Sequence, residues 1–299
     1  MALPPFVLVQ TLLILCLSSW TSGVHILLIG DSTDRNTVIR SCVHLHGAGS
    51  SFGGSDFVSR NGRTKKSWDS QDIDDRRGIE EAFPAANTTN WSDLTCWLPE
   101  LQLRISTLSV FGSSSPPYFL GMCTKGAEDD GPYCNTTARI ERGVGVLRAK
   151  HGQPDTVIFQ SVLWDMRATS EPGSQGVAPE PFLKSYRERI QQLLRLCPSS
   201  HVALRTAPTE EEYRYHTQAE AFNAQVVRRV WQETNSHPNK NASLFLFDWA
   251  LHAHRLHNQS LFAEDNCHLT HAGCVDQLLA ITRLSTLMTA NLLKSMYSW

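Results

Sequence analysis

Short apolar runs alternate with longer amphipathic stretches along most of the chain. Runs rich in β-branched and aromatic residues, each typical of a β-strand, occupy 24–29, 104–111, 155–160, 201–206 and 243–248. Apolar residues recur at helical spacing over 34–45, 136–150, 180–196, 215–233 and 272–296. This alternation indicates a parallel sheet covered on both faces. We therefore predict an α/β fold, a three-layer α/β/α sandwich.

The first predicted strand runs directly into Gly30, Asp31 and Ser32. Active sites in such sheets lie at the carboxyl ends of the strands. Gly30 suits a tight turn, and Ser32 would lie in the first turn of the next helix, where unpaired amides could stabilise an oxyanion. The alternative is that Asp31 or Ser32 only caps that helix.

A second chemical signal lies between the last strand and the last helix, where Asp265 and His268 are three residues apart. A serine becomes nucleophilic when a neutral imidazole accepts its proton and a carboxylate orients that imidazole. Ser32, His268 and Asp265 therefore form a candidate triad if the sheet brings the two segments together. His271 competes as the base, although no carboxylate lies three residues before it.

Together these segments resemble the SGNH (GDSL-type) hydrolase superfamily, and more narrowly its PC-esterase-like members. The resemblance is carried by "GDSTDR" at 30–35, "FQSVLWDM" at 159–166, "FDWALHAHR" at 247–255 and "DNCHLTHAG" at 265–273. It implies Ser32 as nucleophile, His268 as general base and then acid, and Asp265 as its orienting partner. It also implies a mostly parallel, five-stranded, flavodoxin-like sheet and ester hydrolysis without a cofactor.

One block departs from the family pattern. Most SGNH enzymes have an asparagine that donates to the oxyanion at the position of Trp164, followed by an aspartate, here Asp165. We therefore assign the oxyanion hole to the backbone amides of Ser32 and Gly112, with a glycine of 47–100 as the alternative to Gly112. Asp31, Trp164 and Asp165 are expected to line the pocket.

The amino-terminal residues predict a secreted or ER/Golgi lumenal protein. Residues 6–18 are apolar and uncharged, and small residues precede Gly23, which indicates a signal peptide at 1–23. Because "MALPP" has no lysine or arginine, an uncleaved anchor is the alternative. The remaining 24–299 would form one domain, with a surface insertion at about 47–100 that is rich in glycine, serine and aspartate.

Sequons and cysteines fit that compartment. Five N-x-S/T triplets predict glycosylation at Asn87, Asn90, Asn135, Asn241 and Asn258. Of 8 cysteines, Cys16 would leave with the signal peptide, so an odd number remains and at least one thiol lacks a partner within the chain. Disulfides are expected, and one between Cys123 and Cys134 would close the loop between them.

Composition and charge exclude several other classes of protein. The net charge is −2 and there is no basic stripe, so no nucleic-acid partner is predicted. No membrane contact is expected beyond the amino-terminal anchor. His252, His254 and His257 lack neighbouring cysteines or carboxylates at ligand spacing, and Asp72, Asp74 and Asp75 lack the other elements of a calcium loop. We predict no metal and no cofactor, and the oligomeric state is left open.

These inferences converge on a serine esterase that hydrolyses an O-acyl ester, foremost an O-acetyl ester, through an acyl-enzyme. The expected partner is an acylated small molecule or glycan. One alternative is a glycan O-acyltransferase that uses the same residues. The other is a catalytically inactive glycan-binding or interaction protein that retains the fold.

Overall fold

A computed structural model describes most of the domain. The described residues are 23–53, 82–83, 93–110, 112–115, 135–169, 179–209, 211, 215–236, 244–255, 261–262 and 269–289. Residues 1–22, nearly all of the predicted signal peptide, lie outside them. Among the described helices, none is both long and apolar enough to cross a membrane.

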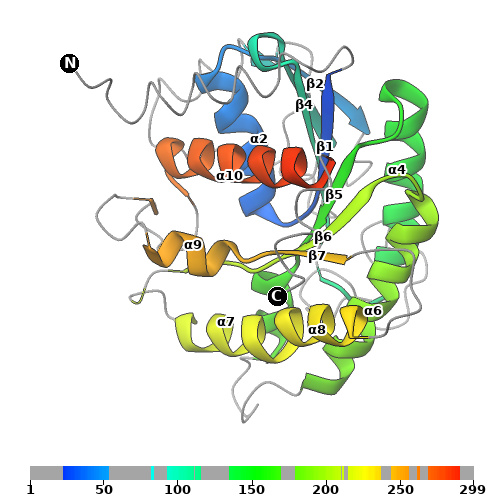
Figure 1. Cartoon of the computed structure of the whole chain (residues 1–299), viewed down its shortest axis with the longest axis vertical. Coiled ribbons are helices and arrows are strands. Elements are labelled where there is room, and N and C mark those ends of the chain that lie inside the picture. Colours follow the sequence, from blue (N-terminus) through cyan, green and yellow to red (C-terminus); the bar gives the residue numbers. More distant parts are fainter. Residues whose placement is uncertain are drawn as a thin grey trace, which may run out of the picture.

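Five neighbouring strands of the sheet are parallel, as the sequence predicts (Figure 1). They are β1 (Val24–Gly30), β4 (Leu103–Ser109), β5 (Thr156–Phe159), β6 (His201–Arg205) and β7 (Leu244–Phe247), which is the edge strand of this group. Their order across the sheet is β4-β1-β5-β6-β7, with all four neighbouring pairs parallel. This is the flavodoxin-like order, in which the first strand lies between the second and third parallel strands.

Two further strands extend this sheet at the β4 edge, so the predicted count of five is two too low. β3 (Asp93–Leu98) pairs antiparallel with β4, and β2 (Ala48–Gly53) pairs antiparallel with β3. Both lie within 47–100, the range predicted as a surface insertion. The side chains of Leu94 and Cys96 are fully buried, so the carboxyl-terminal end of that range is part of the core.

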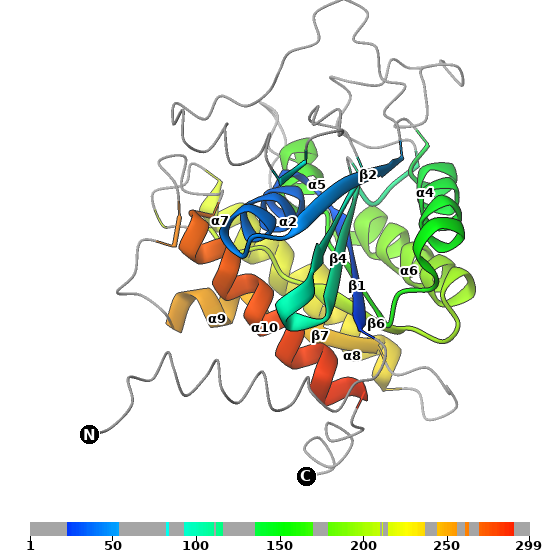
Figure 2. The same cartoon turned by 90° about the horizontal axis from the view of Figure 1, so that it is seen from above.

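Helices cover both faces of the sheet (Figure 2). One face is covered by α2 (Ser32–His44), α9 (Trp249–Arg255) and α10 (His271–Thr289). The other is covered by α4 (Thr136–His151), α5 (Val162–Thr169), α6 (Pro179–Leu196) and the continuous stretch α7 (His216–Phe222), η2 (Asn223–Arg228) and α8 (Arg229–Asn235), in which η2 is a π-helix. A short 3₁₀ turn, η1 (Pro99–Leu101), links β3 to β4. The three-layer α/β/α prediction is therefore confirmed.

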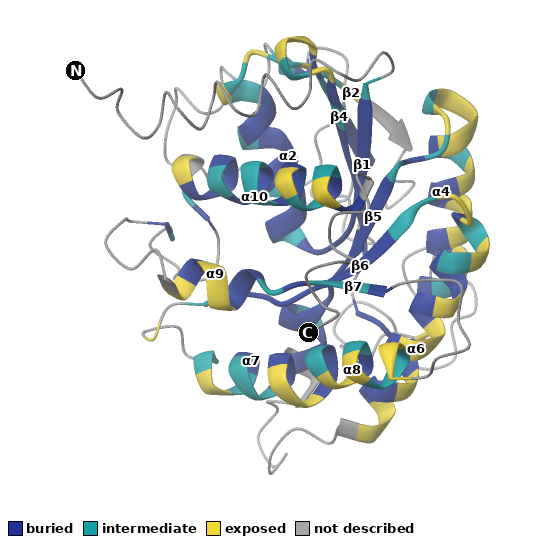
Figure 3. Ribbon diagram, in the orientation of Figure 1, coloured by how far each residue is buried: buried dark blue, intermediate teal, exposed yellow. Residues whose placement is uncertain are grey.

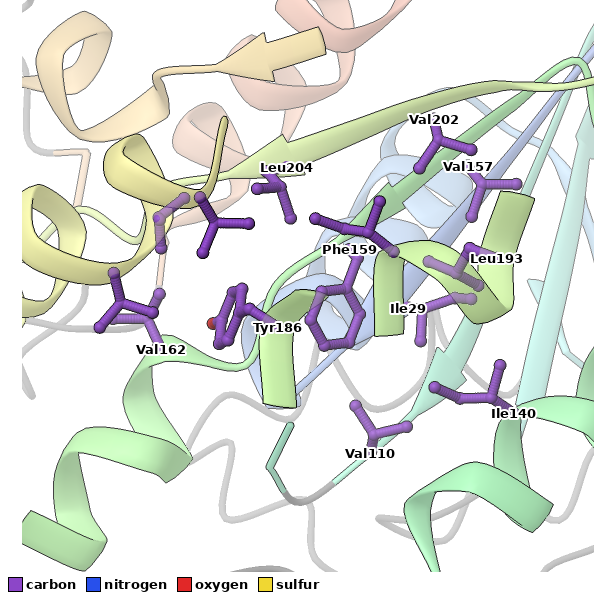
Figure 4. Close-up of a cluster of buried hydrophobic side chains, with 14 of the residues drawn as sticks. Ile29, Val110, Ile140, Val157, Phe159, Val162, Tyr186, Leu193, Val202 and Leu204 are labelled. Carbon is purple, nitrogen blue, oxygen red and sulfur yellow. The ribbon is translucent and has the colours of Figure 1, made fainter. Parts of the chain in front are cut away.

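Apolar side chains form a separate hydrophobic core on each face of the sheet. Every residue of β1 is buried, because one set of side chains faces α2 and α10 and the other faces α4 and α6 (Figure 3). Figure 4 shows the core on the face covered by α4 and α6, which contains Ile29, Phe159 and Tyr186 of α6. The rings of Phe159 and Tyr186 meet edge to face, with centroids 5.3 Å apart.

A disulfide between Cys42 of α2 and Cys96 of β3 ties a helix to the edge of the sheet. Cys197 and Cys274 are buried free thiols. Cys123 and Cys134 lie outside the described residues, so their pairing stays a prediction.

We expect the double substitution Cys42→Ala/Cys96→Ala to lower the free energy of unfolding by about 3 kcal/mol. The disulfide closes a loop with a sequence separation of 54, and opening it restores conformational entropy to the unfolded chain. Urea denaturation under non-reducing conditions measures the change. Cys197→Ala is the control, because it removes a buried sulfur without opening a cross-link. A double variant that loses no more than twice the loss of this control would contradict the prediction.

Candidate active site

Ser32 is the first residue of α2, immediately beyond the carboxyl end of β1. The helix cap is Asp31, whose carboxylate accepts hydrogen bonds from the Thr33 amide at 2.8 Å and the Thr33 hydroxyl at 2.6 Å. Asp31 is 2% exposed, whereas Ser32 is partly exposed. The capping role that the sequence left open between these two residues therefore belongs to Asp31, and Ser32 lies in the first turn of the helix.

Gly30 is required by close packing rather than by the tight turn that the sequence suggested. Its φ angle is not in the positive region, which among the described glycines is occupied by Gly112 and Gly152. A Cβ atom on Gly30 would lie 1.9 Å from a carboxylate oxygen of Asp34. The absence of a side chain thus lets the Asp34 carboxylate lie directly against the end of β1.

Asp34 is at the centre of a buried network that holds the first turn of α2. Arg205, at the end of β6, forms an ion pair with Asp34 at 2.8 Å and donates to the Thr33 hydroxyl at 3.2 Å. Gln160, at the end of β5, donates to the same hydroxyl at 3.3 Å and to the second Asp34 oxygen at 3.1 Å. Two neighbouring strands therefore fix Thr33 and Asp34, the two residues that follow Ser32.

Burial controls the charge of this network. It raises the pKa of Asp34 to about 6, and the positive charge of Arg205 opposes that rise. Both side chains are only 1% exposed. At neutral pH Asp34 is therefore ionised and compensates the guanidinium of Arg205, while protonation below pH 6 would leave that buried guanidinium without its counter-charge.

A second buried network holds Gly112, which follows β4. β4 runs beside β1, and the Val110 amide donates to the Gly30 carbonyl at 2.7 Å. Gly112 is buried with a φ of 140°, a conformation that favours glycine. The next amide, that of Ser113, donates to both carboxylate oxygens of Asp165 at 3.0 and 3.1 Å. The segment predicted to supply the second oxyanion amide is thereby anchored beside the end of β1.

Asp165 is a buried acceptor at the start of α5. The Ser161 hydroxyl donates to it at 2.5 Å, and the Ser161 amide donates to the phenolic oxygen of Tyr186 at 3.2 Å. Burial raises the pKa of Asp165 to about 6. The hydrogen bonds that Asp165 accepts from Ser161 and Ser113 oppose the rise, and the negative charge of Asp31 adds to it. Trp164 is partly exposed. The assignment of Asp31, Trp164 and Asp165 to a substrate pocket stays a prediction.

Asp265 and His268 lie outside the described residues, but both ends of their loop are described. Phe262 and Leu269 form an antiparallel bridge, and the Thr270 amide donates to the Leu261 carbonyl at 2.8 Å. The two ends of the segment 263–268 are therefore side by side.

These ends lie against α2. The guanidinium of Arg40 donates to the Leu269 carbonyl, and the hydroxyl of Thr37 donates to Gln277 of α10. Arg40 follows Ser32 by two helical turns, a rise of about 12 Å. The residue after His268 thus contacts the same helix that begins with Ser32.

The glycine of the last block has a packing role. A Cβ atom on Gly273 would lie 2.4 Å from the Leu261 carbonyl oxygen. Glycine at this position lets the first turn of α10 approach the backbone of Leu261, which precedes the segment 263–268.

The remaining predicted residues fall in several places. Asn135 is exposed and caps α4, with its side chain accepting from the Ala138 amide. The other four predicted glycosylation sites, Asn87, Asn90, Asn241 and Asn258, lie outside the described residues. His271 is the first residue of α10, and the ring of His252 stacks on Trp249. Among the described residues, no group of three or more histidines, cysteines or acids could hold a metal ion.

Sequence reasoning missed Gln160 and Arg205. Gln160 is the last residue of the predicted strand at 155–160, and Arg205 is the next-to-last residue of the predicted strand at 201–206. A charged residue at the carboxyl end of a buried parallel strand is the signal that could have identified Arg205, because such a position faces the site and requires a partner.

Comparisons with known proteins give structural neighbours. No protein-family model matches the chain, and no curated protein sequence matches it. A mutant acetyl-xylooligosaccharide esterase from Geobacillus aligns with a TM-score of 0.43 at 16% identity, over 88% of this chain and 94% of that chain. A carbohydrate esterase of family 3 from Talaromyces cellulolyticus aligns with a TM-score of 0.42 at 13% identity, over 91% and 99%. A peptidoglycan O-acetylesterase aligns with a TM-score of 0.46 at 10% identity, over 96% of both chains.

These TM-scores and identities are low. We therefore base the function proposed below on the residues of this chain alone.

Proposed function

We propose that the protein is a serine esterase of the SGNH type that hydrolyses an O-acyl ester, foremost an O-acetyl ester carried by a glycan. The observation that carries the proposal is the setting of Ser32. It is a partly exposed serine in the first turn of a helix that begins where β1 meets β5, with the capping role taken by Asp31. In the flavodoxin-like strand order, this junction is the place where ligands bind.

In the proposed mechanism, His268 accepts the proton of Ser32 while the Ser32 oxygen attacks the ester carbonyl carbon. The amides of Ser32 and Gly112 stabilise the oxyanion, and Asp265 orients His268 and stabilises its cation. The tetrahedral intermediate collapses to an acyl-enzyme as His268 protonates the departing alcohol. Water, deprotonated by His268, then releases the acid and restores Ser32.

The buried networks support this mechanism because they fix both proposed oxyanion donors. Asp34, Gln160 and Arg205 fix the turn that carries Ser32. Asp165 fixes the amide that follows Gly112. Preorganised donors stabilise a developing charge without reorganising during the reaction, so rigid donors favour catalysis.

We also propose that the protein works outside the cell or in the ER/Golgi lumen, after removal of residues 1–23. The disulfide between Cys42 and Cys96 fits an oxidising compartment. The apolar segment at 6–18 fits a signal peptide, and glycosylation at the sequons follows from the same proposal.

Fluorophosphonate labelling tests the esterase proposal directly. We expect the reagent to label the wild type at Ser32, as located by peptide mass spectrometry, and to leave Ser32→Ala and His268→Ala unlabelled. Ser236→Ala is the control, because Ser236 is exposed at the end of α8. Absence of label on folded wild type would refute the enzymatic proposal and favour the glycan-binding alternative. Product analysis with added sugar acceptors separates hydrolysis from acyl transfer.

We expect esterase activity to fall as the pH drops below about 6. His268 must be neutral to accept the serine proton, and an ordinary histidine protonates near pH 6.5. Asp34 must be ionised to compensate Arg205, and burial sets its pKa at about 6. Both groups are needed in the deprotonated form, so the two effects have the same sign. A kcat/KM profile that stays flat from pH 5 to pH 8 would contradict the mechanism.

A further inference from the structure

A pocket of about 300 Å³ lies beyond the carboxyl end of β6, separate from the residues of the two buried networks. Its walls come from the segment that follows β6, from α7, from α9 and from Leu261 and Phe262. This volume is at the lower end of the range for small-molecule sites.

Several elements connect the pocket to the proposed active site. Pro208 lines the pocket and lies three residues after Arg205, which contacts Thr33 and Asp34 beside Ser32. Phe262 lines it too and directly precedes the segment that carries Asp265 and His268. The pocket therefore lies at the same edge of the sheet as Ser32.

Part of the pocket lining is polar and carries hydrogen-bonding groups. Glu211 and Glu220 contribute carboxylates, and His216 is paired with the Thr209 hydroxyl at 2.9 Å. The guanidinium of Arg228 also lines it, but Asp248 compensates that charge through two hydrogen bonds of 2.8 and 2.9 Å. Two carboxylates beside a neutralised guanidinium accept hydroxyl donors and repel an anionic ligand.

Other lining residues of the pocket are apolar, among them Pro208, Ala250, Leu251 and Phe262. Leu251 is 44% exposed, and among the described residues Leu287 of α10 is the other large aliphatic side chain with comparable exposure, at 36%. A ligand that matches this mixed lining needs both hydroxyl groups and C–H surface.

We propose that this pocket binds one neutral sugar residue of the glycan that carries the ester. A sugar ring presents hydroxyls around its edge and C–H groups on its faces. The hydroxyls match the carboxylates of the pocket, and the C–H groups match Leu251 and the other apolar lining residues. The negative side chains discriminate against uronic acids and other acidic sugars. The link to catalysis rests on the esterase function proposed above, whereas binding itself does not.

Calorimetry on the Ser32→Ala protein tests binding without turnover. The probes are cellobiose, xylobiose, lactose and chitobiose, with digalacturonic acid as the acidic comparison. We expect at least one neutral disaccharide to bind, and digalacturonic acid to bind at least about tenfold more weakly. Adding Leu251→Asn should weaken the neutral disaccharide by about tenfold, since the substitution replaces apolar contact surface. Leu287→Asn is the matched control and should leave the affinity unchanged.

Kinetics then test the link to catalysis. In the active protein, Leu251→Asn should lower kcat/KM for an acetylated form of the bound disaccharide by about tenfold, whereas Leu287→Asn should leave that kcat/KM unchanged. If Ser32 takes up fluorophosphonate but no neutral disaccharide binds, the pocket proposal is overturned and the esterase proposal stands. If a disaccharide binds through Leu251 while Ser32 is never labelled, the esterase proposal fails and the sugar site stands. Equal binding to the Leu251→Asn and Leu287→Asn proteins would also overturn the pocket proposal.

Discussion

Ser32→Ala is expected to lower kcat for ester hydrolysis by roughly 10⁴-fold or more, with little change in folding. Loss of the nucleophile removes the acyl-enzyme route, and single removals of a serine nucleophile reach such factors in other triad enzymes. Ser32 is partly exposed and Asp31 caps the helix, so the missing hydroxyl should change the free energy of unfolding by less than about 1 kcal/mol. Steady-state hydrolysis of 4-nitrophenyl acetate and thermal unfolding measure the two quantities.

Ser236→Ala controls for the general effect of losing an exposed hydroxyl. A Ser32→Ala protein that keeps more than about a tenth of the wild-type kcat would exclude Ser32 as the nucleophile. Loss of activity together with a large drop in the melting temperature would instead show that Ser32 acts through the fold.

Asp34→Asn is expected to destabilise the protein by about 3 to 5 kcal/mol at pH 7. The substitution leaves Arg205 as a buried guanidinium without its counter-charge, and breaking one side of a buried ion pair has this cost. Arg205→Met should cost less, because the remaining Asp34 can take up a proton. Urea denaturation at several pH values measures both.

The pH dependence of Arg205→Met has a definite sign. Burial already raises the pKa of Asp34 to about 6, and removing Arg205 removes the charge that opposes the rise. A folded-state pKa above the unfolded value makes the folded state bind more protons, so stability falls as the pH rises through the folded pKa. Relative to the wild type, Arg205→Met should therefore be closest in stability at pH 5 and furthest from it at pH 8.

The exposed pair Arg187 and Glu233 supplies the matched control, with side chains that are 43% and 37% exposed. Glu233→Gln should cost at most about 1 kcal/mol. If Asp34→Asn costs no more than Glu233→Gln, the network around Arg205 does not hold the first turn of α2.

The elements that the sequence predicted correctly are those with a strong local pattern. The strands β1 and β5 are short, mostly apolar runs that are buried at every position, because both faces of the sheet are covered there. The helix that follows β1 was predicted to begin two residues too late. Its cap at Asp31 depends on a contact with Thr33, which the spacing of apolar residues along the chain does not reveal. Only a structure could assign the cap to Asp31 rather than to Ser32.

The elements that were missed depend on contacts between distant segments. β2 lies in the stretch "AGSSFG", where polar and small residues hide the strand. Its pairing needs Gly49, because a Cβ there would meet the ring of Phe83 at 2.2 Å. Neither the disulfide partner of Cys42 nor the ion pair of Arg205 is visible in local spacing, because many cysteines and acids were available to each.

By itself, the sequence determined the layered α/β architecture and singled out Ser32 at the end of the first strand, because burial periodicity and strand ends are local properties. The tertiary structure decided which residues meet at that end. Strand order places β4, β5 and β6 around β1, and this order brings Gly112, Gln160 and Arg205 to the turn that carries Ser32. Strand order follows from the packing of the whole domain, so no window of the chain encodes it.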